Sequence, residues 1–124
     1  MIKGVGIDMI EVQRVLEKIG KSNGFKEKIY SKEEIALCDL HASHGEAYAA
    51  RFAAKEAFLK ATGRGLTLGH DLADIAILND TMGKPYIELR GSFKDEAVQN
   101  EWNKIHLSIS HLQAVACAVV IIEQ

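Results

Sequence analysis

The first part of the chain changes from a mostly apolar segment to one with helical periodicity. Residues 2–10 are short, apolar and contain two glycines, which predicts a buried strand that ends at Asp8. In residues 11–19 the apolar positions recur three and four residues apart, the spacing of an amphipathic helix. Gly20 and the cluster at 22–24 then predict a break.

Two further helices are predicted before the middle of the chain. Ser31 followed by Glu34 is the signature of a capping box, so a helix is expected from Lys32 to about Leu40. A longer, alanine-rich helix is expected from about residue 46 to residue 62, ending at Gly63.

The second half is dominated by strand patterns. Strands are predicted at 73–78 and 85–89 around a turn that contains Gly83, and at 105–109, where apolar and polar residues alternate. A short helix is predicted at 92–102, and the apolar run at 115–122 is typical of a central strand covered on both faces. This order predicts one α+β domain over residues 1–124, with a mostly antiparallel sheet packed against helices that include one long central helix.

Composition and charge exclude several functional classes. The chain is 48% hydrophobic and 26% charged, as in soluble globular proteins, and its net charge of -2 excludes a globally basic nucleic-acid binder. No apolar run approaches the roughly 20 residues that a membrane helix needs. The two cysteines, Cys38 and Cys117, lie far apart, and the first residues lack a secretory signal pattern, so we expect a cytoplasmic protein without disulfides.

The first candidate site is Asp8, with Glu11 just beyond it. Carboxylate oxygens at a strand end can converge on a hard cation. The alternative is that Asp8 caps the following helix. Taken alone, the position favours the cap, because junctions of strand, aspartate and helix are common.

The second candidate site is the charged part of the long helix. Glu56 and Lys60 are four residues apart and share a face, as do Arg51 and Lys55. A solvated helix with ordinary ion pairs is one interpretation. Small residues lie among these charges and indicate close packing instead. Charges within a packed helix favour a functional role. The small residues are Ala53, Ala54, Ala57 and Ala61.

Two glycines and a histidine are weaker candidates. Gly63 and Gly65 leave the backbone open to a ligand, although their spacing is not that of a phosphate-binding P-loop. His111 ends the alternating strand, where an isolated histidine is better explained as a hydrogen-bonded turn residue.

A zinc site is not favoured. Cys38, His41 and His44 are three residues apart, which would suit one helix face. Ser43 and Gly45 indicate that the helix has ended by then, and no fourth ligand is near in the sequence.

Taken together, three segments closely resemble the holo-acyl-carrier-protein synthases, the short members of the phosphopantetheinyl transferase superfamily. They are GVGIDMIEVQR at 4–14, RFAAKEAFLKATGRG at 51–65 and SISH at 108–111. The helix core at 52–61 is the most specific, and the Gly-Lys-Pro turn at 83–85 also fits. Arg64 departs from the pattern, since many relatives carry a smaller residue there. The resemblance covers the whole chain and implies the 4'-phosphopantetheinyl transferase fold.

The resemblance implies a reaction and roles for the candidate residues. A serine of an acyl carrier protein would attack the phosphate that carries the pantetheine of coenzyme A, and adenosine 3',5'-bisphosphate would leave. Negative charge grows on phosphate oxygens, so a divalent ion and cationic side chains lower the barrier. The implied catalytic residues are Asp8 and Glu56, which would hold Mg²⁺, and Lys60, which would neutralise the phosphates. The implied contacts to the nucleotide end of coenzyme A are Arg51, Gly63, Gly65 and His111.

The base that accepts the serine proton stays open between a metal-bound water and Glu56 acting through a water. His111 is a weaker candidate, because its expected place is beside the nucleotide phosphates.

The segment 14–32 is the candidate docking surface for the carrier protein. It holds six basic and two acidic residues, which is six minus two, or +4, in a chain of net charge -2. Acyl carrier proteins are acidic, and the resemblance implies that they dock here; the contact residues would be Arg14, Lys21, Phe25 and Lys28. A solvated helix face is the alternative.

The resemblance also implies a homotrimer with active sites between subunits and a role in fatty acid biosynthesis. Two other functions are weighed against it. A magnesium-dependent hydrolase of nucleotide pyrophosphates would use the same carboxylates but would have no use for the basic segment. A non-catalytic module that binds coenzyme A or the carrier is disfavoured by the presence of Asp8, Glu56 and Lys60.

Overall fold

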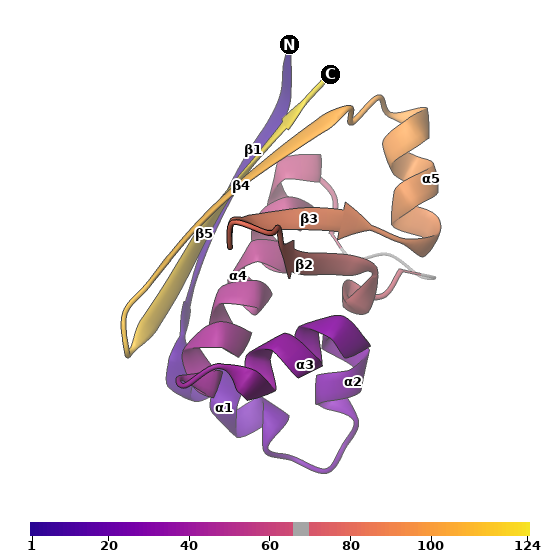
Figure 1. Ribbon diagram of the computed structural model, residues 1–124. Coiled ribbons are helices and arrows are strands. Elements are labelled where there is room, and N and C mark those ends of the chain that lie inside the picture. Colours follow the sequence, from indigo (N-terminus) through magenta and orange to yellow (C-terminus); the bar gives the residue numbers. More distant parts are fainter. Residues whose placement is uncertain (66–69) are drawn as a thin grey trace.

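The computed structural model of the chain describes residues 1–65 and 70–124. In chain order its elements are β1 (Ile2–Glu11), α1 (Val12–Ile19), α2 (Phe25–Ile29), α3 (Lys32–Leu40), α4 (His44–Thr62), a 3₁₀ turn η1 (Leu72–Asp74), β2 (Ile75–Asn79), β3 (Pro85–Leu89), α5 (Gly91–Gln99), β4 (Lys104–His111) and β5 (Val115–Glu123) (Figure 1). The predicted α+β class is confirmed. Of these elements, the short helix α2 and the turn η1 were not expected from the sequence, which predicted a strand already at residue 73.

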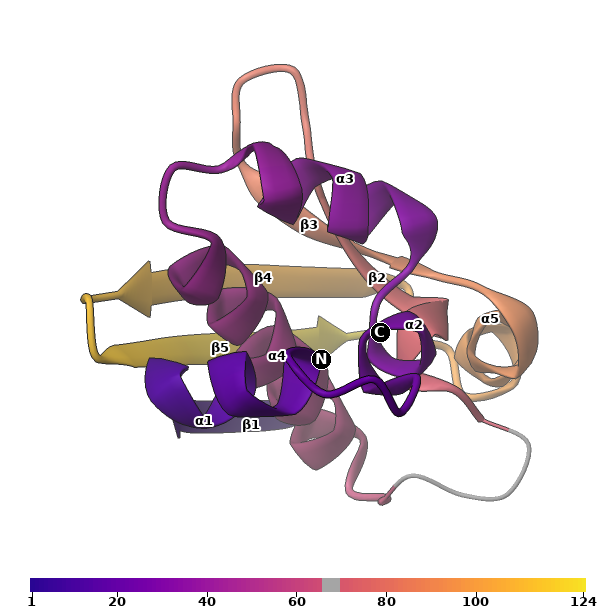
Figure 2. The same ribbon diagram turned by 90° about the horizontal axis from the view of Figure 1, so that it is seen from below.

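The strands form two antiparallel sheets. One has the order β1-β5-β4, and the other is the hairpin of β2 and β3. Helix α4 runs along one face of the three-stranded sheet, and α1, α2 and α3 gather near its N-terminal end (Figures 1 and 2). The first and last residues lie side by side, with Gln124 N donating to Met1 O at 2.9 Å.

Two glycines let α4 lie directly on β1. A Cβ atom at Gly4 would lie 1.8 Å from the carbonyl oxygen of Ala61, and one at Gly6 would lie 1.9 Å from that of Ala57. Any larger residue would push the helix away. Asp8 is two residues beyond Gly6, on the same face of the strand, so this close contact brings its side chain to α4.

The core lies between α4 and the sheets. Phe58 of α4 packs edge-on against Phe93 and Trp102, and Ala118, Val120 and Ile122 of β5 complete that layer. A second cluster joins α4 to the first three helices, where Tyr30 packs edge-on against Tyr48.

The helix ends follow the predicted signals. Ser31 and Glu34 form the expected capping box at the start of α3, with hydrogen bonds of 3.3 and 3.0 Å. Gly63 ends α4 in the left-handed conformation, with φ of 73°. None of the helices in the described part of the chain is long and apolar enough to cross a bilayer.

Two predictions about strands were wrong. β1 is not a buried strand that ends at Asp8: it is an edge strand that continues to Glu11, and Asp8 pairs with Ala118 within it. β5 is central, but only one of its faces is buried in this chain. Both errors have one cause, because apolar residues on the outer face of the sheet were interpreted as core.

Candidate active site

The carboxylates of Asp8 and Glu56 line one pocket. Asp8 comes from β1 and Glu56 from α4, and α1 adds Arg14 and Lys18 to the rim. The two acidic residues are distant in the sequence and meet because α4 lies so close to β1.

Asp8 does not cap a helix. The residue at the N-cap of α1 is Glu11, and its side chain makes no capping hydrogen bond. Asp8 instead accepts a hydrogen bond from Lys60 Nζ at 3.1 Å, and the same ammonium donates to Ile7 O at 3.0 Å. The cap interpretation, which the sequence position alone favoured, is therefore wrong.

The electrostatics of the pocket suit a cation. Burial raises the pKa of Glu56, and the nearby charge of Asp8 raises it further, so the ionised form is destabilised without a positive partner. Lys60 and Lys18 lower that pKa in part. Within 1–65 and 70–124, no three His, Cys, Asp or Glu side chains converge as a metal site. A pair of carboxylates is nevertheless what Mg²⁺ uses when substrate phosphates and water complete its coordination.

A second pocket adjoins the first at Glu56. It is lined by Glu56, Lys60, Gly63, Gly65 and other residues that include Leu72. Gly63 and Gly65 add no side chain on this wall. The prediction that these glycines leave the backbone open to a ligand stays a prediction.

Arg64, the departure from the family pattern, is directed toward α5. Its guanidinium donates to Glu96 at 3.3 Å and to Asn100 at 3.2 Å. An arginine at this position is therefore held by neighbours in the same chain.

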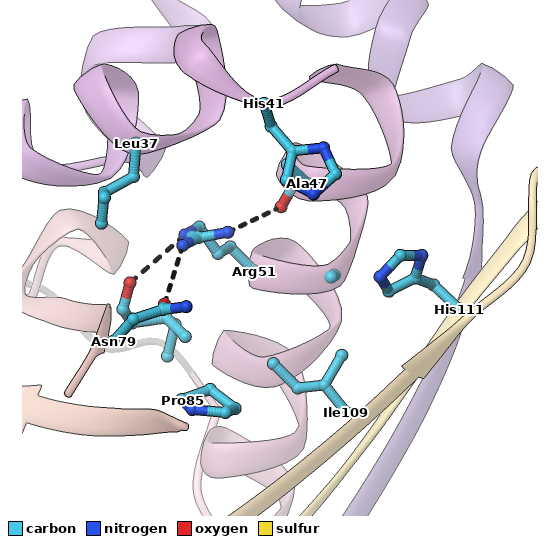
Figure 3. A pocket seen from close by; sticks show the side chains of 10 residues that line it. Leu37, His41, Ala47, Arg51, Asn79, Pro85, Ile109 and His111 are labelled. Atoms are coloured by element: carbon cyan, nitrogen blue, oxygen red, sulfur yellow. Dashed lines mark hydrogen bonds between the residues drawn. The ribbon is translucent and has the colours of Figure 1, made fainter. Parts of the chain in front are cut away.

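A third pocket contains Arg51 and His111. Arg51 donates to Ile77 O at 3.2 Å, to Asn79 Oδ1 at 3.1 Å and to Ala47 O at 3.4 Å, which fixes the guanidinium along the wall (Figure 3). His111 enters from β4, and its Nδ1 lies 2.8 Å from Oε1 of Glu46. That contact lowers the pKa of Glu46.

The residues expected at the nucleotide end of coenzyme A therefore fall into two groups. Arg51 and His111 share the third pocket, whereas Gly63 and Gly65 line the second. Among the described residues, each pair thus lines a pocket of its own.

The predicted carrier-contact residues lie on α1, on α2 and on the loop between them. Arg14, Lys21 and Lys28 are exposed, and Arg14 also lines the pocket of Asp8. Phe25 is half-buried: its ring stacks on Phe52 at 6.4 Å. Phe25 is thus a partly covered surface residue.

Lys18 adds a cation to this surface. Its Nζ lies 5.8 Å from the ring of Phe25 and 5.7 Å from the ring of Phe52. The ammonium is thereby held between the docking segment and the pocket of the two carboxylates.

Cys38, His41 and His44 are engaged separately. The Cys38 side chain is buried, and burial raises the pKa of its thiol to about 11. His41 Nδ1 accepts from Ser43 N at 3.0 Å, and His44 Nδ1 lies 3.3 Å from Cys38 O.

Sequence reasoning missed the partners that hold these residues. Lys55 was noted only for sharing a face with Arg51, yet it forms a fully buried ion pair with Glu34, 21 residues away. The Glu46 contact to His111 was also missed. The capping box identified Glu34 as the partner of Ser31. Its second partner, Lys55, is too distant in the chain to leave a local signal.

Comparison with known proteins identifies the family. Residues 4–120 match the family model described as the 4'-phosphopantetheinyl transferase superfamily. A protein of Treponema denticola named holo-[acyl-carrier-protein] synthase is 46% identical over 125 residues, which covers 99% of each chain.

Solved structures agree with this assignment. The crystal structure of the synthase from Neisseria meningitidis superposes with a TM-score of 0.91 at 28% identity and full coverage of both chains. A synthase from Bacillus anthracis in complex with CoA (3',5'-ADP) superposes with a TM-score of 0.80 at 35% identity, covering 98% of this chain and 96% of that one. The chain belongs to the 4'-phosphopantetheinyl transferase superfamily and, within it, to the holo-[acyl-carrier-protein] synthases.

Proposed function

We propose that the protein transfers 4'-phosphopantetheine from coenzyme A to a serine of an apo-acyl carrier protein in a magnesium-dependent reaction. The observation that carries the proposal is the meeting of Asp8, Glu56 and Lys60 beside an open, glycine-lined pocket. Family membership and the coenzyme A complexes of related synthases support the choice of substrate.

The reaction exchanges the phosphoanhydride bond of coenzyme A for a phosphoester bond to the serine. The serine oxygen bonds to the phosphorus next to the pantetheine, the bond from that phosphorus to the bridging oxygen breaks, and adenosine 3',5'-bisphosphate leaves with the electron pair. Lys60 is exposed enough to reach the leaving group, because its side chain is 57% exposed despite the contact with Asp8. Glu56, whose pKa burial raises, can accept the serine proton through a water.

Asp8 and Glu56 would hold Mg²⁺ in this scheme. The ion supplies charge neutralisation at the diphosphate. The fit rests on two carboxylates in one pocket, one of which is destabilised as an anion by burial and by the other.

The basic surface of α1 and α2 is proposed to dock the acidic carrier. Of its exposed cations, Arg14 also lines the carboxylate pocket, so the two sites adjoin. A carrier held there would present its serine to the reacting phosphate, and charge complementarity would speed its association.

We also propose that the active form is a homotrimer. The outer face of the three-stranded sheet is apolar: Val5, Ile7 and Met9 of β1 are 59, 57 and 68% exposed. The register places them opposite Ile121, Val119 and Cys117 of β5, so they form one continuous patch. Other copies of this chain would cover that patch, and a site between subunits would explain why the coenzyme A residues lie in separate pockets of one chain.

The same proposal includes the cellular compartment and the pathway. Both cysteines are free thiols, which fits the cytoplasm, and the holo-carrier product serves fatty acid biosynthesis.

Mass spectrometry of an apo-acyl carrier protein tests the function. After incubation with the protein, coenzyme A and Mg²⁺, the carrier is expected to gain one phosphopantetheine. Coenzyme A incubated with the protein alone should stay intact, since a hydrolase would cleave it without a carrier. An unmodified carrier together with cleaved coenzyme A would show that the protein is a hydrolase and not a transferase.

A further inference from the structure

Lys55 and Glu34 form an ion pair that is closed off from solvent. Both side chains are 0% exposed, and Lys55 Nζ lies 2.8 Å from Glu34 Oε1. The ammonium also donates to Leu72 O at 2.9 Å and to Ile75 O at 2.6 Å. All three of its hydrogens therefore have an acceptor.

Glu34 extends these contacts to two more segments. Its Oε1 accepts from Ser31 N at 3.0 Å, and its Oε2 accepts from Ile77 N at 3.2 Å. One ion pair thus ties the start of α3, the turn η1 and strand β2 to helix α4.

Stability alone does not account for this arrangement. Burial lowers the pKa of Lys55, which reflects the cost of keeping a charge away from water. Apolar side chains of similar volume often stabilise a core as well as a buried ion pair does. The role of the ion pair is therefore inferred from the segments that it holds in place.

Those segments form walls of two different pockets. Leu72, whose carbonyl accepts from Lys55, lines the pocket of Lys60, Gly63 and Gly65. Ile77, whose N–H is held by Glu34, lines the pocket of Arg51, and its carbonyl accepts from Arg51 Nε at 3.2 Å. The ion pair lies behind both walls.

We infer that Lys55 and Glu34 are positioning residues for coenzyme A: they hold η1 and β2 on α4 so that both pockets keep their shape and Arg51 keeps its orientation. This inference rests on the proposed function. The pair touches neither Asp8 nor Lys60, and α4 is held independently on β1 by the close contacts at Gly4 and Gly6. The carboxylate pocket should therefore survive the loss of the pair.

The inference predicts a specific kinetic pattern. Without the pair, KM for coenzyme A should rise about tenfold or more, because small displacements of binding groups have large effects, while kcat stays within about threefold. KM for the carrier protein should rise less than KM for coenzyme A, because the pair borders α2 only at Tyr30 and Ser31, whereas Arg14 and Lys21 lie on α1 and on the loop after it.

The test uses a variant that removes both charges, Glu34→Gln combined with Lys55→Met. Removing one partner alone leaves a buried charge and is more disruptive. The control is Ile122→Ala, which opens a cavity in the core at a β5 residue that lines neither pocket. Thermal unfolding measures how much stability the double variant and the control each lose. Steady-state kinetics gives KM for each substrate.

We expect a raised KM for coenzyme A in the double variant and a wild-type value in the control, even if the control loses as much stability. A wild-type KM in the folded double variant, or an equal rise in the control, would overturn the inference. Should the double variant not fold, Glu34→Leu combined with Lys55→Met, which leaves no polar side chain at either position, is assayed against the same criteria. Wild-type protein that fails to modify the carrier would reject the proposed function instead.

Discussion

Lys60 donates to the carboxylate of Asp8 across 3.1 Å, so one cation lies against one of the two acidic groups of this pocket. The lysine is one helical turn from Glu56 and projects into the same region. A divalent ion bound to Asp8 would compete with this contact, and the ammonium of Lys60 would then be available to the phosphates.

Replacing Lys60 with methionine should separate metal binding from catalysis. We expect kcat to fall by roughly 10²–10³, because a charge aimed at the reacting phosphate is lost. Calorimetric titration should show Mg²⁺ binding at least as tightly as in the wild type, because the competing ammonium is gone. Lys104→Met, an exposed change at the far end of β4, is the control. A fall in kcat of less than about threefold would contradict the role of Lys60.

Glu56→Gln should change how stability depends on pH. The folded-state pKa of Glu56 is raised above its unfolded value, so the metal-free wild type loses stability as pH rises through that folded pKa. The amide does not titrate, and the variant should unfold at a higher temperature than the wild type near neutral pH, with the difference vanishing in acid. Thermal unfolding in chelator from about pH 4 to about pH 8 measures this.

The same variant should not respond to metal. Mg²⁺ should raise the unfolding temperature of the wild type, as any ligand of the native state does, and leave Glu56→Gln unchanged. Equal metal responses in both proteins would show that Glu56 is not a ligand.

Reversing charge on the docking surface should weaken the binding of the carrier protein and not that of coenzyme A. In the double variant Lys21→Glu with Lys28→Glu, KM for the carrier should rise about tenfold at low salt, because exposed pairs contribute up to about 1 kcal/mol each. The effect should shrink as salt is added, and KM for coenzyme A should stay constant. Lys94→Glu, on the exposed face of α5, is the matched control. An equal effect of the control would point to general charge repulsion instead of docking.

An acidic residue on the outer face of the sheet should prevent assembly. Val5→Asp puts a carboxylate in the apolar patch and should give monomers with little activity, since burying an unpaired charge is costly. Light scattering after size exclusion measures the mass. Val98→Asp makes the same change at a residue of α5 that is 77% exposed and should leave assembly intact. A Val5→Asp trimer, or a monomeric wild type with full activity, would contradict this proposal.

Local signals explain which parts of the fold were predictable. The three-four spacing of α1, the capping box at Ser31 and the left-handed Gly63 each act within a few residues, and all three were found. The patch at Val5 and Ile7 misled the prediction of burial, because an apolar surface that another chain would cover has the same pattern as a core.

The site was less predictable where long-range packing decides it. The resemblance named Asp8, Glu56 and Lys60, but their geometry depends on Gly4 and Gly6, whose contacts lie on a helix far along the chain. Taken alone, Asp8 favoured the wrong interpretation as a cap.

The most direct test of the carboxylate pair is an anomalous diffraction map of crystals grown with coenzyme A and Mn²⁺ in place of Mg²⁺. The account predicts one peak about 2.0–2.2 Å from an oxygen of Asp8 and from an oxygen of Glu56, in contact with the diphosphate. A peak bound to only one of these side chains, or none beside a well-ordered diphosphate, would contradict it.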